Sequence, residues 1–532
     1  MDANITILGE STWRSLSVLA LNSSFYVPIF FGASCIYILS LYRSHFDNFK
    51  PPLVGRKSIY EPEWSVGFRF LRNASSIIQR GYDQFKHQVF RIRRIDGDIF
   101  VIPSENLDRF RNAPEEEVNG LEAHIKNLFG PYSTTDMMLD SDLPTRVIQQ
   151  KLTPSLTSVV STMKDEIDHA LEIEVPNCQD EWVPVQAFDL LSRIIARVST
   201  RVFLGQEICR NEEWYVVSMR YMENVYMLIK SMRMIPPSLH PFLSPLLPSY
   251  WRVRSSLRDG KRFMRPFIQE RLSEARNSMG QQKSPDLLQW MIEIGFPNEL
   301  IPDKLAHRQL LMNLAATHTT GMAATHVLYD LCAQPEYLQQ IREELIEVLS
   351  KHGGWHKSII PKFRKLDSFM KESQRLNPPA LIAFNRIARV ELTLVDGTKL
   401  PSGTHFCMAS DAISHDKAYI PGEGDPDAFQ PLRWFQLRND PSDPDNSHRY
   451  QFATTDSTSL HFGHGKFACP GRFFAGQLIK MIIGHLLLQY DFKYPEGLGR
   501  PKNCYFDENI SPDPSARVLI RRRKSSADGK SW

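Results

Sequence analysis

The stretch that most constrains this chain runs from His461 to Arg472 and reads HFGHGKFACPGR. It places two glycines, Gly463 and Gly465, shortly before a single cysteine, Cys469, and an apolar run follows from Phe473 to Tyr490. Because glycine adopts backbone conformations that other residues avoid, this pattern predicts a tight loop at the N-terminus of a buried helix, with Pro470 in the first turn of that helix. The free N–H groups and the dipole of a helix N-terminus stabilise a thiolate. We therefore predict that Cys469 is a nucleophile or a metal ligand.

Three interpretations of Cys469 follow from the residues themselves. The first is a structural cysteine buried beside a turn. The second is a zinc site formed by His461, His464 and Cys469, which requires a fourth ligand that no Cys-x-x-Cys or paired histidine spacing supplies. The third is a thiolate that serves as the axial ligand of a haem iron.

Composition excludes some classes of function. The 532 residues carry a net charge of only +3, which argues against a nucleic acid partner. The chain is long enough for one large domain or for two to three smaller ones. Its 7 cysteines are odd in number and unevenly spaced. We therefore expect no disulfide framework, and we expect the catalytic domain to face a reducing compartment.

The N-terminal part contains an uncharged apolar run from Ser24 to Tyr42. It approaches the ~20 residues that a helix needs to cross a bilayer, although a buried core helix and a cleaved signal peptide are alternatives. Lys and Arg are more frequent after the run than before it, which predicts a cytosolic main domain and a lumenal N-terminus. On that lumenal side, Asn4 lies in a glycosylation sequon. The predicted divisions are a lumenal segment 1–23, a transmembrane anchor 24–42, a linker 43–60 and a catalytic domain 61–532.

Several segments carry clear signals of secondary structure. The segment 214–251 is rich in Met and Pro. It is either an irregular core segment, or a flexible apolar lid or a loop that dips into a membrane. The other predicted elements are a helix over 66–86, a hairpin over 87–103 around Asp96-Gly97, a mostly helical region over 145–204 and a long helix over 305–334.

The middle of that long helix reads AATHTTG from Ala315 to Gly321. Threonine and glycine are poor residues for a helix interior. They indicate either close packing against a neighbouring helix or the approach of a cofactor or oxygen to the backbone.

Further along, Glu372 and Arg375 stand at the i,i+3 spacing that lets side chains pair on one helix face. Alone, such a pair is a weak signal, because most instances are solvated surface pairs. A second arginine, Arg433, follows in the sequence FQPLRW.

The cysteine stretch resembles the haem-binding loop of the cytochrome P450 family, with Phe462, Gly465, Cys469 and Gly471 at the spacing Phe-x-x-Gly-x-x-x-Cys-x-Gly. The long helix, the Glu-x-x-Arg pair and the Arg-Trp segment precede it in the order that the family requires. The resemblance runs from the predicted anchor to the end of the chain. It implies a mainly α fold with a small β region, preceded by a single transmembrane helix.

The resemblance also implies roles for individual residues. Cys469 becomes the axial ligand of haem b, and Thr319 supplies the hydroxyl that assists oxygen activation, with Thr320 beside it. His318 stands where the family usually has an acid and is predicted to relay protons. A buried cluster of Glu372, Arg375 and Arg433 is expected to lock the loop that leads to the cysteine. Arg386 resembles a partner of a haem propionate, as does His415. Two residues before the cysteine, Phe467 replaces the basic residue that the family often has. Where the family has a Trp-x-x-x-Arg motif that faces the propionates, this chain has Arg146 and Lys151 but no tryptophan.

The function implied is hydroxylation of a lipophilic secondary metabolite, of terpenoid type as in similar fungal members, with O2 as oxidant. Electrons would come from NADPH through NADPH–cytochrome P450 reductase, docked near Lys466 and Arg472. The expected location is the endoplasmic reticulum membrane, with a single pass and a cytosolic catalytic domain. The alternatives are an oxygen-independent haem-thiolate isomerase or dehydratase, a polyketide substrate, and a non-catalytic haem or metal binder.

Overall fold

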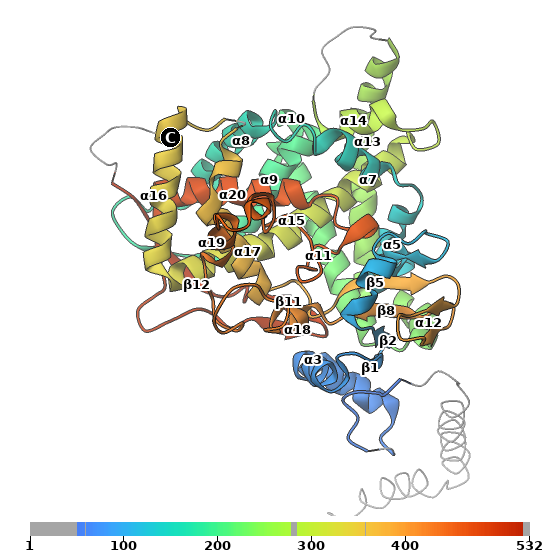
Figure 1. Ribbon diagram of the computed structural model, residues 1–532. Helices are drawn as coiled ribbons and strands as arrows, with labels where there is room; N and C mark the ends of the chain where they lie inside the picture. Colours follow the sequence, from blue (N-terminus) through green and yellow to red (C-terminus); the bar gives the residue numbers. More distant parts are fainter. Residues whose placement is uncertain (1–50, 59, 278–284, 357, 525–532) are drawn as a thin grey trace, which may run out of the picture. The chain divides into compact units, whose positions relative to one another are not determined.

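Helices make up most of the structure, and short strands form small sheets beside them (Figure 1). The computed structural model describes residues 51–58, 60–277, 285–356 and 358–524. Nearly all of them belong to one unit, Pro52–Trp532, which is separate from Met1–Pro51. The prediction of a mainly α fold with a small β region is confirmed.

The predicted lumenal segment 1–23 and anchor 24–42 lie outside the described residues, as does most of the linker 43–60. Among the residues that are described, no helix is both long and apolar enough to cross a membrane.

The central element is α15 (Pro302–Ala333), which confirms the long helix predicted from the sequence. It packs against α9 (Ala187–Leu204), α13 (Pro248–Asn277), α17 (Arg364–Leu376) and α20 (Arg472–Gln489), as Figure 1 shows. A helix that has neighbours on all sides must be apolar or small around its whole circumference. This explains why α15 lacks a polar stripe and carries alanine, threonine and glycine at its centre.

The Met-rich segment is more regular than predicted. Its first part forms α11 (Glu212–Arg233), whose start is capped by the Asn211 side chain accepting a hydrogen bond from Trp214 N. Methionine is a good helix former, so the methionines do not interrupt the helix. The irregular part is confined to the prolines that follow, where only short helical turns form: η4 (Pro237–Leu239), α12 (His240–Leu243) and η5 (Ser244–Leu246).

The remaining helices connect these elements. The predicted helix over 66–86 is α3 (Glu63–Phe85). The predicted helical region over 145–204 is mostly confirmed; the segment between Glu174 and Ala187 is not helical and contains a short strand. The others are α4 (Leu107–Phe110), α5 (Gly120–Asn127), α6 (Gly130–Ser133), α7 (Leu143–Val147), α8 (Val160–Glu174), α10 (Gln206–Cys209), α14 (Leu287–Ile294), α16 (Pro335–His352), α18 (Ser410–Ser414) and α19 (Arg433–Arg438). Short turns are η1 (Ser104–Asn106), η2 (Thr135–Leu139), the π-helical η3 (Ile148–Leu152), η6 (Ile360–Lys362), η7 (Pro444–His448) and η8 (Gly465–Phe467).

The largest sheet in the described chain has five strands in the order β1-β2-β8-β5-β3. The hairpin of β1 (Phe90–Arg94) and β2 (Gly97–Val101) confirms the predicted turn, since Gly97 has a φ of 133° that other residues rarely adopt. The other strands of this sheet are β3 (Val118–Asn119), β5 (Ala383–Ala388) and β8 (His405–Met408). The smaller sheets consist of β4 (Val183–Gln186) with β12 (Arg517–Arg522) and β9 (Tyr490–Lys493), β6 (Leu392–Thr393) with β7 (Lys399–Leu400), and β10 (Cys504–Phe506) with β11 (Asn509–Ser511).

Candidate active site

The cysteine loop is held by its glycines. Gly463 and Gly465 have φ angles of 67° and 72°, in the left-handed region that favours glycine. A Cβ atom on Gly465 would lie 2.0 Å from the carbonyl oxygen of Arg111, so no larger residue fits there. The loop closes where the Cys469 N–H donates a hydrogen bond of 2.7 Å to the carbonyl of Phe462. These contacts fix the position of the cysteine.

The helix after the loop begins later than predicted. α20 starts at Arg472, so Pro470 lies in the turn before the helix and not in its first turn. The backbone N–H groups of Gly471 and Arg472 lower the pKa of the Cys469 thiol, as expected of a helix start, but burial raises that pKa by more. The side chain is accessible to solvent and yet lies deep among protein atoms. The protein alone therefore does not suffice to make a thiolate, and a cation at the sulfur would complete the stabilisation.

The centre of α15 has an exposed patch within an otherwise buried stretch. Between Leu305 and Leu331 most side chains are buried, but Ala315 and Thr319 are exposed. The Thr319 hydroxyl donates a hydrogen bond of 2.9 Å to the carbonyl of Ala315. Thr320, in contrast, is buried and does not belong to this patch. The patch is thus an uncovered stretch of a helix that otherwise packs against α9, α13, α17 and α20.

His318 is placed beside this patch, where it stacks on an aromatic side chain of α11. The ring centroids of His318 and Tyr226 are 3.9 Å apart, with an angle of 33° between the planes. The Phe188 ring meets His318 edge-on at 5.8 Å. Burial, assisted by the charge of Lys230, lowers the pKa of His318 to about 4, so the imidazole is neutral at neutral pH. Its predicted role as a proton relay stays a prediction.

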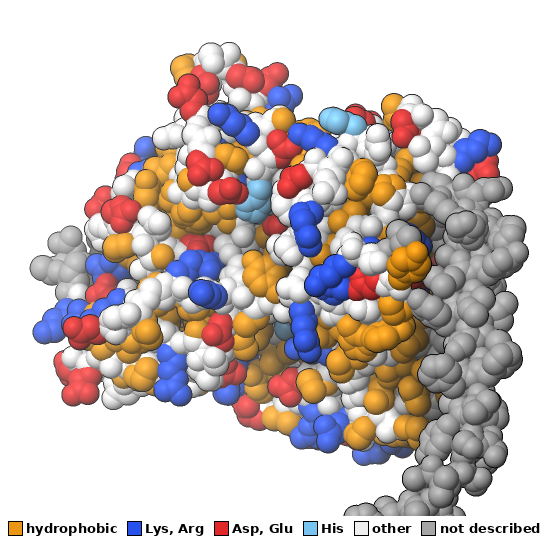
Figure 2. Space-filling model, turned by 90° about the horizontal axis from the view of Figure 1, so that it is seen from below, with side chains coloured by type: hydrophobic (Ala, Val, Ile, Leu, Met, Phe, Trp, Pro, Cys, Tyr) orange, Lys and Arg blue, Asp and Glu red, His pale blue; other side chains and the backbone are white. Residues whose placement is uncertain are grey.

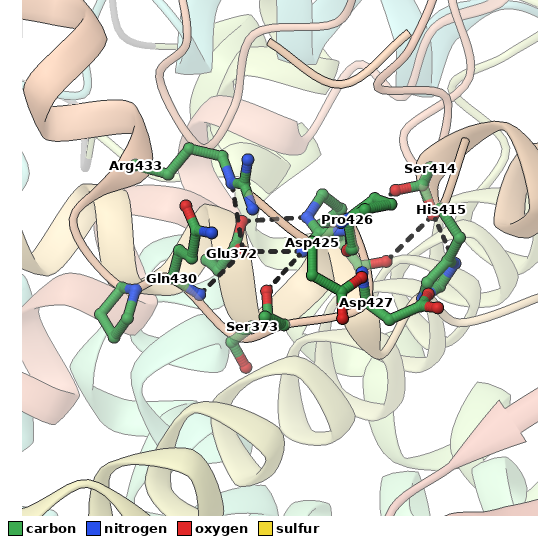
Figure 3. Close-up of polar contacts among 12 residues, drawn as sticks. Glu372, Ser373, Ser414, His415, Asp425, Pro426, Asp427, Gln430 and Arg433 are labelled. Carbon is green, nitrogen blue, oxygen red and sulfur yellow. Dashed lines mark hydrogen bonds and ion pairs between the residues drawn. The ribbon is translucent and has the colours of Figure 1, made fainter. Parts of the chain in front are cut away.

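Glu372, Arg375 and Arg433 come together as a buried cluster, as predicted. Arg375 donates to both carboxylate oxygens of Glu372, at 3.0 and 2.7 Å, and Arg433 Nε lies 3.4 Å from Glu372 Oε1. Two further donors were not foreseen from the sequence: the Gln430 main-chain N–H and the Trp434 indole N–H, each 3.0 Å from Glu372. Figure 3 shows Glu372 between Arg433 and the segment that carries Pro426. The carboxylate is thus fully hydrogen-bonded, as a buried charge requires.

The same cluster ties distant segments together. Arg375 also donates to the carbonyl oxygens of Ser414 at 2.9 Å, Pro426 at 2.6 Å and Ala428 at 3.2 Å (Figure 3). The segment that leads to the cysteine loop is therefore anchored to α17 through one side chain.

A second anchor on α17, Lys371, was missed by the sequence analysis. Its buried ammonium group donates to the carbonyl oxygens of Gln451 and Thr454, each at 3.3 Å, and to Ser459 Oγ at 3.1 Å. Burial lowers the pKa of Lys371. The only sequence signal was its place directly before Glu372.

Arg386, on β5, is a buried cation with no acidic partner among the described residues. Its guanidinium donates to the carbonyls of Asn385 at 2.9 Å and His464 at 3.3 Å, while Nε has no partner in the described chain. It lies over the rings of Phe384 and Phe467, at 3.9 and 4.7 Å from their centroids. Burial alone lowers its pKa to about 9. A buried cation without an anion is costly, so this position fits a negatively charged group of a cofactor.

The other candidates for such a contact already have partners. Arg146 forms an ion pair with Glu299 at 2.8 Å, and Lys151 lies 3.4 Å from Glu293. The His415 ring nitrogen hydrogen-bonds a main-chain carbonyl of its own helix at 2.8 Å. The sequence suggested all of them as candidate partners of a propionate, but of these candidates only Arg386 lies beside the cysteine loop without an acidic partner in the described chain.

These residues fit a haem better than a zinc ion. In the part of the chain that the structure describes, no three side chains of His, Cys, Asp or Glu are close enough together to hold a metal. His464 Nδ1 is instead hydrogen-bonded to Thr455 Oγ1 at 3.0 Å. A single cysteine thiolate from the protein can hold a haem iron, and a cation can balance the charge of a haem propionate. Cys469 and Arg386 can supply these two groups, and Ala315 and Thr319 leave a small, exposed surface on α15.

Comparison with known proteins agrees with this geometry. Residues 89–517 match the family model of cytochrome P450. A cytochrome P450 monooxygenase of Emericella nidulans is 47% identical over 96% of this chain and 96% of its own length. An ent-kaurene oxidase of Gibberella fujikuroi is 40% identical over 93% of this chain and 97% of its own. The monooxygenase paxP of Penicillium paxilli is 36% identical over 93% and 95%. The chain belongs to the cytochrome P450 family and is an enzyme of its monooxygenase class.

Proposed function

We propose that this enzyme hydroxylates a lipophilic intermediate of secondary metabolism, of terpenoid class, with O2 and with electrons that NADPH–cytochrome P450 reductase supplies from NADPH. The observation that carries the proposal is Cys469, held on a loop that Gly465 and the Phe462 carbonyl fix in place. The terpenoid class is supported by one of the similar proteins, which is named an ent-kaurene oxidase.

In this proposal Cys469 holds the iron of haem b, and Arg386 binds a propionate. The haem, when bound, supplies the activation of oxygen and the oxidation of a C–H bond. The chain contributes position and proton control. The exposed hydroxyl of Thr319, already hydrogen-bonded to a helix carbonyl, holds a proton at Oγ1 on the interior patch of α15. The Glu372 cluster keeps the loop in place.

We also propose that the enzyme is anchored in the endoplasmic reticulum membrane by residues 24–42, with its catalytic domain in the cytosol and Asn4 on the lumenal side. Exposed apolar side chains support a membrane-facing surface: Trp64 and Phe68 on α3, and Phe242 and Leu246 in and after α12. Figure 2 shows the molecule from the side on which α3 lies in Figure 1, and hydrophobic side chains gather on that face among Lys and Arg.

The test is the carbon monoxide difference spectrum of the reduced, membrane-extracted protein, beside Cys469→Ala. A strongly red-shifted Soret band that the variant loses is expected for a thiolate ligand. A band typical of histidine ligation, or no haem, would contradict the proposal. Turnover of terpenoid substrates that requires reductase, NADPH and O2 then separates a monooxygenase from an oxygen-independent isomerase or dehydratase.

A further inference from the structure

Two polar side chains from different helices meet beside the interior patch of α15. Tyr226 of α11 and His318 of α15 stack with their ring centroids 3.9 Å apart. Both side chains are partly exposed, although each is surrounded by protein strongly enough to shift its pKa. Their exposed surface therefore belongs to the interior of the molecule, like that of Thr319.

Neither side chain uses its hydrogen-bonding groups within the part of the chain that the structure describes. The Tyr226 hydroxyl and the His318 ring nitrogens have no hydrogen-bond partner among the described residues, and burial is the only influence on the tyrosine. Tyr221, on the same helix, differs, because its hydroxyl is 2.9 Å from Thr134 Oγ1. Because both side chains are partly exposed, these polar atoms stay available to a molecule that reaches them. Two such groups side by side favour a ligand that carries a hydrogen-bonding atom.

The location of the pair indicates what that partner is. His318 directly precedes Thr319, and on a helix with 3.6 residues per turn it lies on the same side as Ala315. A molecule that covers the bare patch of α15 therefore also reaches the Tyr226–His318 pair. The lowered pKa of His318 keeps the imidazole neutral, so it offers one donor and one acceptor, and Tyr226 adds a hydroxyl.

We propose that Tyr226 and His318 together bind an oxygen atom that the substrate already carries, a hydroxyl or a carbonyl, and thereby select and orient an oxygenated lipophile. This inference rests on the proposed function and narrows it. A site with hydrogen-bonding groups for a substrate oxygen discriminates strongly against an analogue that lacks it, because its own groups are then left unpaired. The reaction that precedes this enzyme must accordingly be one that installs a hydroxyl or carbonyl group.

The pair is held in register by the anchoring of α11. Arg233, at the C-terminal end of that helix, lies 2.6 Å from Asp96 and 2.9 Å from Asp507. The Tyr221 hydroxyl, bonded to Thr134, holds the middle of the helix. Tyr226 lies between these two anchors, so its hydroxyl is positioned before a ligand arrives, which reduces the entropy cost of binding.

The experiment uses the full-length holoprotein and 1-alkylimidazoles, which anchor one end at the haem iron and shift the Soret band. Chains of increasing length are compared in pairs that end in a methyl or a hydroxyl group. If the site is wholly apolar, the probe that ends in a hydroxyl binds more weakly than its methyl counterpart at every chain length. We expect one chain length at which the hydroxyl probe instead binds more tightly, by about three- to tenfold, which is the contribution of one hydrogen bond. Tyr226→Phe and His318→Phe, which keep the stacked rings, should each reduce that preference.

The matched control is Tyr215→Phe, which removes a hydroxyl near the N-terminal end of the same helix and should leave the preference unchanged. The inference is overturned if no chain length favours the hydroxyl, or if Tyr226→Phe weakens both members of each pair equally. If no probe shifts the Soret band, the proposed haem site itself falls, together with this inference. A normal shift without hydroxyl preference refutes the inference alone.

Discussion

Arg386 carries a positive charge that no acidic residue of the described chain balances. This imbalance determines how a substitution of Arg386 should affect haem binding and stability. Replacing Arg386 with Met removes a buried cation that has no anionic partner among the residues described in the haem-free structure. We expect haem content per protein to fall severalfold, while the melting temperature of the haem-free form does not fall. Haem is measured as the pyridine haemochrome and stability by calorimetry. Arg146→Met, which breaks the ion pair with Glu299, should show the opposite pattern. Normal haem content in Arg386→Met would contradict the assignment.

Glu372 differs from Arg386 in that its buried charge is already balanced, because hydrogen-bond donors of the protein surround its carboxylate. Glu372→Gln leaves Arg375 and Arg433 buried beside a neutral group, which is expected to cost about 3–5 kcal/mol of unfolding free energy. The denaturation midpoint and the yield of haem-loaded protein measure this loss. Glu122→Gln, which breaks the exposed pair with Arg389, should cost less than about 1 kcal/mol. Similar losses in both variants would show that the cluster is not critical.

Thr319 can be tested against a threonine of the same helix. Thr319 and Thr325 each donate to a carbonyl one turn earlier, at 2.9 and 2.7 Å, but Thr319 is exposed on the interior patch and Thr325 is buried. We expect Thr319→Ala to uncouple the enzyme, so that NADPH is consumed while product per NADPH falls and hydrogen peroxide rises. Thr325→Ala should change stability and leave coupling intact. Unchanged coupling in Thr319→Ala would refute the role of this hydroxyl.

At the scale of elements, a buried ionic cluster joins three segments that are distant in sequence. Arg94 of β1 lies 2.7 Å from Glu508 and 2.9 Å from Asp96, and Arg233 of α11 lies 2.9 Å from Asp507. The cluster thus connects the β1–β2 hairpin, the end of α11 and the turn between β10 and β11. Because two arginines face three carboxylates, one carboxylate has an energetic reason to be protonated.

That carboxylate is Asp507, whose pKa is raised well above its usual value by burial and by Glu508. The folded state then binds a proton that the unfolded state releases, so this stabilisation is present below the ordinary pKa and is lost as the pH rises through the raised one. Asp507→Asn mimics the protonated form, and Asn tolerates the left-handed φ of 57°. We expect the variant to lose less stability than the wild type as the pH rises above the ordinary pKa of an aspartate, measured by chemical denaturation. Parallel pH profiles would contradict this.

At the scale of the whole molecule, the haem site lies between elements of unequal stability. α15 packs against several helices along most of its length, whereas the cysteine loop is held by the Phe462 carbonyl and by a hydrogen bond to the carbonyl of Arg111. Haem binding stabilises the folded state by mass action, so its removal should lower the melting temperature. We expect hydrogen exchange after haem removal to increase most in residues 461–471 and least in α9 and α15. A uniform increase would show that the haem instead supports the whole fold.

Much of the local structure followed from the sequence. The Asp96-Gly97 turn, the long helix over most of Pro302–Ala333 and the pairing of Glu372 with Arg375 depend on turn chemistry and helical spacing, which neighbouring residues decide. The start of α20 and the helical nature of the Met-rich segment were misjudged, because glycine and proline mark an interruption without saying which residue ends it.

The sequence by itself determined that this chain has a cysteine on a loop held by glycines. That motif was enough to indicate the cytochrome P450 family. Only the tertiary structure decided which charges are balanced: Arg146 meets Glu299, while Arg386 meets no acid in the described chain. It also decided that His318 stacks on Tyr226. The physical reason is that backbone conformation depends on adjacent residues, whereas burial and pairing depend on segments that folding brings together from far apart in the chain.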